Sequence, residues 1–172
     1  ALPISLVIVN SPFARETYAN AGYPIDRFVV LPLGAPELPP VEREPRSTDL
    51  APLRLAWGGN FAWHKGAAVL VDALSSFGDR TDIRLDVYGQ VHLPAACLER
   101  LPSWVTLHGA VPRATFLELL ATSDVLVHPS LSDGFAMVVS EAMALGVAPI
   151  VSTATGASAL VCDGESGRIV PA

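Results

Sequence analysis

The chain has 172 residues, 51% of them apolar, and a formal net charge of −6 at pH 7. This length fits one ordinary domain with a small appendage, and the apolar content is enough for a buried core. The acidic balance argues against a general nucleic-acid surface, because phosphate backbones demand clustered Lys and Arg. No apolar run approaches the roughly 20 residues that a membrane-spanning helix needs.

The two cysteines, Cys97 and Cys162, stand far apart, and the sequence contains no CxxC motif and no Cys/His cluster. We therefore expect neither a disulfide framework nor a structural zinc site. The default setting for such a chain is reduced and cytoplasmic. The chain opens on alanine rather than methionine and ends directly after a predicted strand, so we expect a piece of a longer protein.

The first part of the chain predicts one strand–helix–strand unit. An apolar run at 6–9 is typical of a buried strand, and a helix is predicted through 14–21, ending at Gly22. A second strand follows at 27–31. Residues 35–52 carry five prolines and many charges without an apolar period, which predicts a linker.

From residue 53 onward the pattern is regular. Apolar runs predict strands at 53–57, 83–88, 105–107, 124–128, 148–152 and 168–170. Helices are predicted at 67–77, 95–101, 112–122 and 136–145, with a short helix after Thr155. In the helix at 67–77, the predicted apolar face consists of Val69, Leu70, Ala73 and Leu74. Apolar strands that alternate with helices predict an α/β fold, a Rossmann-like parallel sheet with helices on both faces.

Glycine-containing loops follow four of these strands, at 59–66, Gly89, Gly109 and 129–134. Parallel sheets of this kind bind ligands beyond the carboxyl ends of their strands, at the point where strand order reverses. The four loops are therefore expected to meet at one binding edge.

The most informative stretch is 129–146, PSLSDGFAMVVSEAMALG. Its acids Asp133 and Glu141 lie eight positions apart, and its helix is predicted to stop at Gly146. The free N–H groups and the positive dipole end of this helix would form a seat for an anion. A carboxylate deeper in the helix would be placed to accept both hydroxyls of a ribose. The combination predicts a nucleotide-sugar site.

Several residues have two interpretations. Lys65, the only lysine of the chain, would pair with a diphosphate or be a solvated loop residue. Asp133 would bind sugar hydroxyls or cap the helix. Ser130 would donate to a phosphate or stabilise a turn, and Arg113 would border a base or begin a surface helix. Glu141 has apolar neighbours, which favours a ligand role over a solvated one.

The histidines and tryptophans are expected to be structural. No two of the histidines His64, His108 and His128 share metal-ligand spacing. None of these three is expected to be catalytic. His128 lies beside an apolar strand and is expected to be a core residue. The tryptophans are expected to pack: Trp57, Trp63 and Trp104. No DxD motif is present, so a metal-bridged diphosphate and a metal site are not expected.

Residues 53–170 resemble the C-terminal, donor-binding half of group 1 (family 4) retaining glycosyltransferases, which have the two-domain GT-B fold. The matching segments occur in family order: GGNFAWHKG, DVYGQ, VTLHGAVPR, SDVLVHPSLSDGFAMVVSEAMALGVAPIVS and ATGASALVCDGESGRIV. Residues 1–34 resemble the end of the N-terminal, acceptor-binding half. The resemblance thus implies a remnant at 1–34, a linker at 35–52 and a donor-binding domain at 53–172.

This resemblance implies binding of a nucleotide-diphosphate sugar for retaining transfer to an acceptor, by a hexosyltransferase-type enzyme of polysaccharide or glycoconjugate biosynthesis. The catalytic residues would be Lys65, Asp133 and Glu141. The residues implied in donor binding are Gly59, Asn60, Lys65, Gly89, Arg113, Ser130, Asp133, Gly134, Phe135, Ala136 and Glu141. No cofactor beyond the donor substrate is implied. The expected partners are the donor and the acceptor half of the same polypeptide, with no nucleic acid and with membrane contact only through regions outside this chain. The 172 residues alone are expected to be inactive.

The chain departs from the family pattern at three places. The family usually has Glu where Asp133 stands, an Arg in the region of Gly59 and Asn60, and a second glycine where Val91 stands. One expected diphosphate contact is therefore missing, and a non-catalytic nucleotide-sugar-binding module or partner subunit is the alternative. A dinucleotide enzyme is disfavoured, because no GxGxxG follows the first strand.

Overall fold

The computed structural model describes residues 6–34, 38 and 51–172. The predicted linker at 35–52 lies almost wholly outside the described residues. Among the helices of the described part, none is long and apolar enough to cross a lipid bilayer.

The N-terminal unit is a small sheet of its own. Its elements are β1 (Val7–Val9), α1 (Pro12–Asn20) and β2 (Phe28–Val30), and the two strands pair in parallel. Helix α1 begins where the Ser11 hydroxyl accepts a hydrogen bond from the Ala14 amide at 3.0 Å, with proline at the first helical position. The strand–helix–strand order predicted for this segment is confirmed.

Residues 53–170 form one six-stranded parallel sheet with its helices. The strands are β3 (Leu53–Gly58), β4 (Ile83–Tyr88), β5 (Val105–Gly109), β6 (Val125–His128), β7 (Ala148–Ser152) and β8 (Arg168–Val170). The helices are η1 (Trp63–Lys65), α2 (Ala67–Ser75), α3 (Ala95–Leu98), α4 (Arg113–Ala121), α5 (Met137–Ala144) and η2 (Gly156–Leu160). The strand order β5-β4-β3-β6-β7-β8 is that of a Rossmann sheet, and it reverses between β3 and β6.

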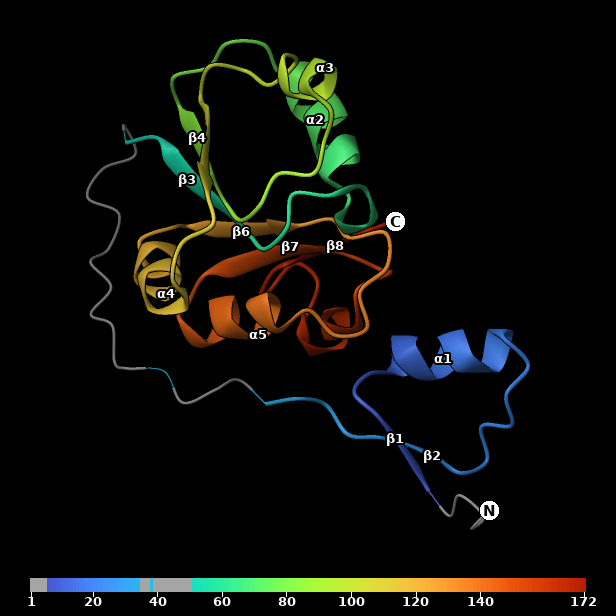
Figure 1. The fold of residues 1–172 in the computed structure, drawn as a ribbon. Helices are drawn as coiled ribbons and strands as arrows, with labels where there is room; N and C mark the ends of the chain where they lie inside the picture. The colour runs from blue at the N-terminus through green and yellow to red at the C-terminus, as the bar shows by residue number, and fades with distance from the viewer. Residues whose placement is uncertain (1–5, 35–37, 39–50) are drawn as a thin grey trace.

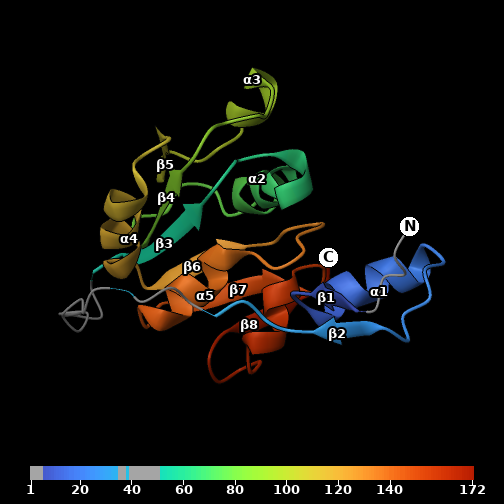
Figure 2. The same cartoon turned by 60° about the horizontal axis from the view of Figure 1, so that its bottom comes forward.

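Helices cover both faces of this sheet, as predicted. Figures 1 and 2 show α2 and α3 on one side and α4 and α5 on the other. Successive residues of β3 point to opposite faces: Trp57 belongs to the core under α2, and Ala56 belongs to the core under α4 and α5. Both side chains are fully buried. The apolar strands therefore reflect burial on two faces rather than one.

The boundaries differ from the predictions by a few residues at the ends of elements. Strands β4, β7 and β8 have the predicted bounds, whereas α2 and α3 end two and three residues early. The predicted apolar face of α2 is partly wrong. Val69 is 51% exposed, and the buried residues of this helix are Ala67, Leu70, Val71 and Leu74. The helix is nearly apolar all round, so periodicity alone could not distinguish position 69 from position 71.

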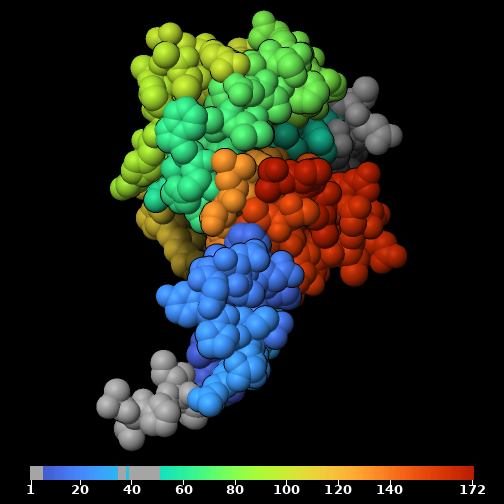
Figure 3. Space-filling model, turned by 90° about the vertical axis from the view of Figure 1, so that its right-hand side faces the viewer, coloured from blue at the N-terminus to red at the C-terminus, as the bar shows by residue number. Residues whose placement is uncertain are grey.

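The N-terminal unit contacts η2 and the loop before α5, near the binding edge. Ser11 is buried, and its hydroxyl donates to the Gly134 carbonyl at 2.6 Å. A Cβ on Gly156 would lie 2.0 Å from the same carbonyl oxygen and 2.4 Å from the Ser11 hydroxyl, so only glycine fits there. Figure 3 shows the unit projecting from the main body and touching its orange and red segments.

Candidate functional site

Two adjoining pockets open at the point where the strand order reverses. The first, here the Glu141 pocket, has a volume of about 530 Å³, and its wall includes Asn60, Tyr88, Gly89, Arg113, Phe116 and Glu141. The second, the Asp133 pocket, has a volume of about 490 Å³, and its wall includes Asn10, Lys65, His128, Asp133, Phe135 and Ala136. The residues that line both pockets are Gly58, Gly59, Asn60, Met137 and Val138. One elongated ligand could therefore occupy both pockets across the end of β3.

Close backbone contacts fix the loops that form these walls. Gly89 has a φ of +145°, and a Cβ there would lie 2.0 Å from the Gly59 carbonyl oxygen. Gly66 has a φ of +78°, and a Cβ there would lie 1.8 Å from the Pro129 carbonyl oxygen. Both positions need glycine for conformation and for space. The loops after β3, β4 and β6 are thus held in direct contact, as the predicted meeting of glycine loops requires.

The Glu141 pocket contains a cation–carboxylate pair. Glu141 lies on α5 and its side chain is 2% exposed, while Arg113 lies at the start of α4 and its side chain is 59% exposed. The Arg113 guanidinium donates to Glu141 Oε1 at 2.5 Å. A nearly buried carboxylate requires such a donor, and a ribose diol could supply another. The sequence placed both residues at the site, but it did not predict that they pair.

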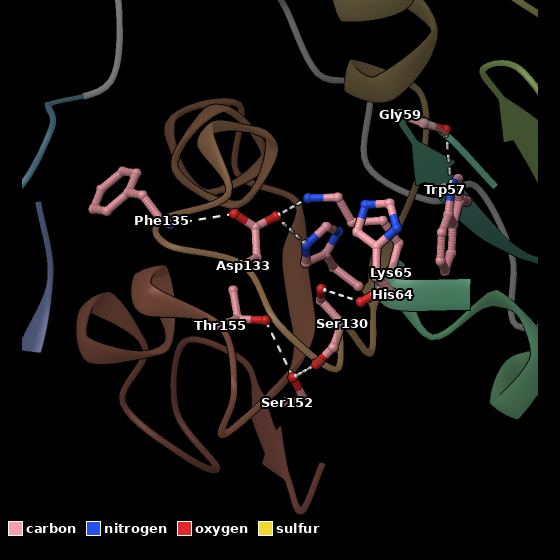
Figure 4. A network of polar contacts seen from close by, with 10 residues as sticks. Trp57, Gly59, His64, Lys65, Ser130, Asp133, Phe135, Ser152 and Thr155 are labelled. Atoms are coloured by element: carbon pink, nitrogen blue, oxygen red, sulfur yellow. Dashed lines mark hydrogen bonds and ion pairs between the residues drawn. The ribbon is translucent and has the colours of Figure 1, made fainter. Parts of the chain in front are cut away.

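The Asp133 pocket contains a second pair, between Lys65 and Asp133 (Figure 4). Backbone hydrogen bonds position the two residues of this pair. The His64 carbonyl accepts from the amides of Leu131 and Ser132, which holds η1 against the loop after β6. Asp133 Oδ2 also lies 3.3 Å from His128 Nε2. Burial raises the pKa of Asp133, but hydrogen bonds from His128 and Lys65 and the charge of Lys65 outweigh it and hold that pKa well below its usual range. Asp133 is therefore ionised at neutral pH.

The start of α5 differs from the prediction. The helix begins at Met137, and the residue before it, Ala136, has a left-handed φ of +66° and caps the helix without a side-chain bond. Of the two interpretations of Asp133, the structure excludes the helix cap: its Oδ1 accepts from the Phe135 amide at 3.2 Å, within the loop. The other end agrees with the prediction, because Gly146 follows α5 with a φ of +72°. Its amide and that of Val147 bond back to the last turn in a Schellman arrangement.

Ser130 does not line either pocket. It is fully buried, and its hydroxyl donates to the His64 carbonyl at 3.1 Å. Its own carbonyl accepts from the Ser152 hydroxyl, which also lies 3.1 Å from Thr155 Oγ1 (Figure 4). Of the two interpretations, the structure therefore supports a turn residue, because the Ser130 hydroxyl already has a backbone partner and faces neither pocket.

The family model for group 1 glycosyl transferases matches residues 52–172. The chain belongs to the group 1 glycosyltransferases. The resemblance inferred from its motifs is thereby confirmed for the predicted donor-binding half.

Two curated proteins and two solved structures illustrate the similarity. The chain is 28% identical to a D-inositol 3-phosphate glycosyltransferase of Pseudarthrobacter chlorophenolicus, over 96% of the chain and 43% of that protein. It is also 33% identical to an N,N'-diacetylbacillosaminyl-diphospho-undecaprenol alpha-1,3-N-acetylgalactosaminyltransferase of Campylobacter jejuni, over 61% of the chain and 28% of that protein. Its fold matches Anabaena HepE in complex with UDP and glucose, with a TM-score of 0.74 at 21% identity over 97% of the chain and 49% of that chain.

WaaG, a glycosyltransferase involved in lipopolysaccharide biosynthesis, matches with a TM-score of 0.73 at 22% identity, over 95% of the chain and 48% of WaaG. These similarities confirm the predicted fold, one half of a GT-B glycosyltransferase. The chain therefore spans less than half the length of the curated relatives and about half the length of the solved structures it matches.

In this member of the group 1 family, the structure brings all the predicted donor-binding residues except Ser130 to the walls of the two pockets. Asn10, Tyr88 and His128 are among the wall residues that sequence reasoning missed. Asn10 and Tyr88 stand at the carboxyl ends of β1 and β4, a position that could have indicated them. His128 is buried as predicted but also lines the Asp133 pocket. The prediction that Trp63 packs is wrong, because it is 54% exposed on η1.

Proposed function

We propose that this chain is the donor-binding part of a retaining, hexosyltransferase-type glycosyltransferase, and that its two pockets hold one nucleotide-diphosphate sugar. The observation that carries the proposal is the pair of adjoining pockets at the switch point, with Glu141 in one and Lys65 and Asp133 in the other. The HepE structure with UDP and glucose supports the same class of ligand. The nucleoside would occupy the Glu141 pocket, and the sugar would occupy the Asp133 pocket.

Each charged group then has a distinct role. Glu141 would accept the ribose hydroxyls, and Asp133 would accept hydroxyls of the donor sugar. The Lys65 ammonium and the amides at the start of α5 would stabilise the diphosphate as negative charge builds on it during departure. Such stabilisation accelerates transfer because it is stronger in the transition state than in the bound substrate. The acceptor and any group that assists it would come from the other half of the parent polypeptide.

A non-catalytic nucleotide-sugar-binding module remains the second candidate. Asn60 lines both pockets at the place where the family usually has an arginine, so the diphosphate would meet Lys65 without that second cation. Both candidates require donor binding. Glycosyl transfer by the full-length protein separates them, because only the enzyme turns over.

Binding itself is tested by thermal denaturation of the protein with UDP-, GDP- and ADP-sugars. We expect one base to stabilise the chain, by ~2.7 kcal/mol at a ligand concentration of 100 Kd. For a domain of this size that free energy corresponds to a shift in Tm of ~5–10 °C. A folded chain whose Tm does not respond to any of these ligands at millimolar concentration would contradict the proposal.

Donor binding is expected to need no divalent metal. Lys65 and the amides of α5 would neutralise the diphosphate in place of a cation. Isothermal titration calorimetry of the nucleotide sugar with and without EDTA checks this, and the two Kd values should agree within about twofold. A loss of affinity of ~10-fold on chelation, or ~1.4 kcal/mol, would show that a bound metal carries part of the charge.

A further inference from the structure

The ammonium that the proposed function assigns to the diphosphate already has an anionic partner. Lys65 Nζ is paired with Asp133 Oδ2, and the two side chains are only 26% and 13% exposed. The same Oδ2 lies 3.3 Å from His128 Nε2, and Oδ1 accepts from the Phe135 amide. Both oxygens of Asp133 are therefore engaged before any ligand binds.

His128 holds Asp133 in place without adding charge to this pocket. Its side chain is nearly buried, and its Nδ1 is buried without a hydrogen-bond partner among the described residues. A proton on Nδ1 would be an unsatisfied buried donor, which is costly, so the favoured tautomer carries its proton on Nε2 and donates it to Asp133. The Asp133 pocket then contains one positive and one negative charge, Lys65 and Asp133.

The Lys65 ammonium has three N–H donors, but Asp133 neutralises its charge, so a diphosphate gains the full electrostatic attraction of Lys65 only if Asp133 gives up that contact. When a free nucleoside diphosphate binds, Asp133 is left as a partly buried carboxylate facing further negative charge, which is unfavourable. When an intact nucleotide sugar binds, the sugar hydroxyls lie beside the diphosphate and can donate to the oxygen that the ammonium leaves.

Building on the proposed function, we propose that Asp133 and the donor diphosphate compete for Lys65, and that sugar hydroxyls replace the ammonium on Asp133 only when the donor is intact. Asp133 is then a specificity-determining residue that disfavours the nucleoside diphosphate product relative to the nucleotide sugar. This role is distinct from a simple sugar contact, because it predicts that removing the carboxylate improves product binding.

The decisive variant is Asp133→Asn, which keeps an oxygen for the Phe135 amide and removes the charge. Calorimetry would compare UDP with UDP-glucose, GDP with GDP-mannose and ADP with ADP-glucose, using the pair that the unmodified protein binds. We expect the variant to bind the nucleoside diphosphate about threefold to tenfold more tightly, as loss of a partly exposed ion pair implies. It should bind the intact nucleotide sugar no more tightly than before.

Two controls define the result. Asp82→Asn removes the same charge from an exposed pair with Arg80. Asp82 directly precedes β4, at the amino ends of the strands and away from both pockets, so this change should alter neither affinity. The double variant Lys65→Met with Asp133→Asn should lose the gain in product affinity. If Asp133→Asn does not fold, Asp133→Ser replaces it, because the serine hydroxyl can also accept a hydrogen bond from the Phe135 amide.

Unchanged or weaker diphosphate binding by a folded Asp133 variant would overturn the competition and leave the proposed function intact. A double variant that binds the diphosphate as tightly as Asp133→Asn alone would also overturn it, because the gain over the unmodified protein would then not arise from the freed ammonium. If the unmodified protein binds neither member of any pair, both the proposed function and the competition are wrong.

Discussion

Lys65→Met is expected to weaken binding of a nucleoside diphosphate by about a hundredfold, or ~2.7 kcal/mol. Two effects add. The ligand loses a charged donor, and such hydrogen bonds contribute ~1.5–3 kcal/mol. In addition, Asp133 keeps its charge but loses its partner, so it repels the diphosphate. Methionine preserves an unbranched side chain of similar length, which limits changes in packing at η1.

Calorimetry with the nucleoside diphosphate measures the loss, and the Tm of each variant shows whether the fold is retained. Adding Asp133→Asn to Lys65→Met should recover part of the affinity, because the stranded carboxylate is then removed as well. A double variant that is weaker than Lys65→Met alone would contradict this electrostatic explanation. A loss below about threefold for Lys65→Met itself would show that the ammonium does not contact the ligand.

The sheet could be predicted because most residues of its strands are apolar and do not alternate with polar ones. Burial on both faces makes residues such as Leu55, Ala56 and Trp57 apolar without alternation, so the order of strands and helices follows from the sequence. The position of the site then follows from topology, since the loops after β3, β4 and β6 must meet at one edge. The family resemblance added the assignment of Lys65, Asp133 and Glu141 to one ligand.

The contacts inside the site could not be predicted in this way. Lys65 and Asp133 are 68 positions apart and Arg113 and Glu141 are 28 apart, so their pairing depends on the geometry of loops. The sequence also placed Asp133 as a possible helix cap. The left-handed turn at Ala136, a residue type that rarely adopts it, moves the start of α5 beyond the reach of that carboxylate.

The N-terminal unit adds one contact that no local pattern encodes. The Ser11 hydroxyl has two partners, since it accepts from the Ala14 amide at the start of α1 and donates to the Gly134 carbonyl. A serine at a helix start is predicted to cap, and the sequence gives no reason to expect the second bond. Through it, the loop that holds Asp133 is braced by a segment more than 120 residues earlier.

Glu141→Gln is expected to weaken binding of a ribonucleotide by about tenfold to a hundredfold and to leave binding of its 2′,3′-dideoxy analogue nearly unchanged. The carboxylate is almost buried, so a charged acceptor there contributes ~1.5–3 kcal/mol to a bound hydroxyl. The amide that replaces it has a single acceptor oxygen and presents donors to a diol. It also weakens the contact with Arg113, but that guanidinium is largely exposed and can be solvated.

Calorimetry with both ligands separates the ribose contact from a structural role, because the dideoxy analogue lacks the hydroxyls but fills the same pocket. Glu165→Gln is the matched control. This exposed residue lies in the turn before β8, at the amino ends of the strands, so the affinities for the ribonucleotide and for the dideoxy analogue should stay the same. Arg113→Met tests the other member of the pair. If Arg113 competes with the ribose for Glu141, its removal should strengthen ribonucleotide binding, and if it supports the bound base, its removal should weaken binding of both ligands. Equal losses for ribonucleotide and dideoxy analogue in Glu141→Gln would mean that Glu141 shapes the pocket through Arg113 and α5 instead of binding the ribose.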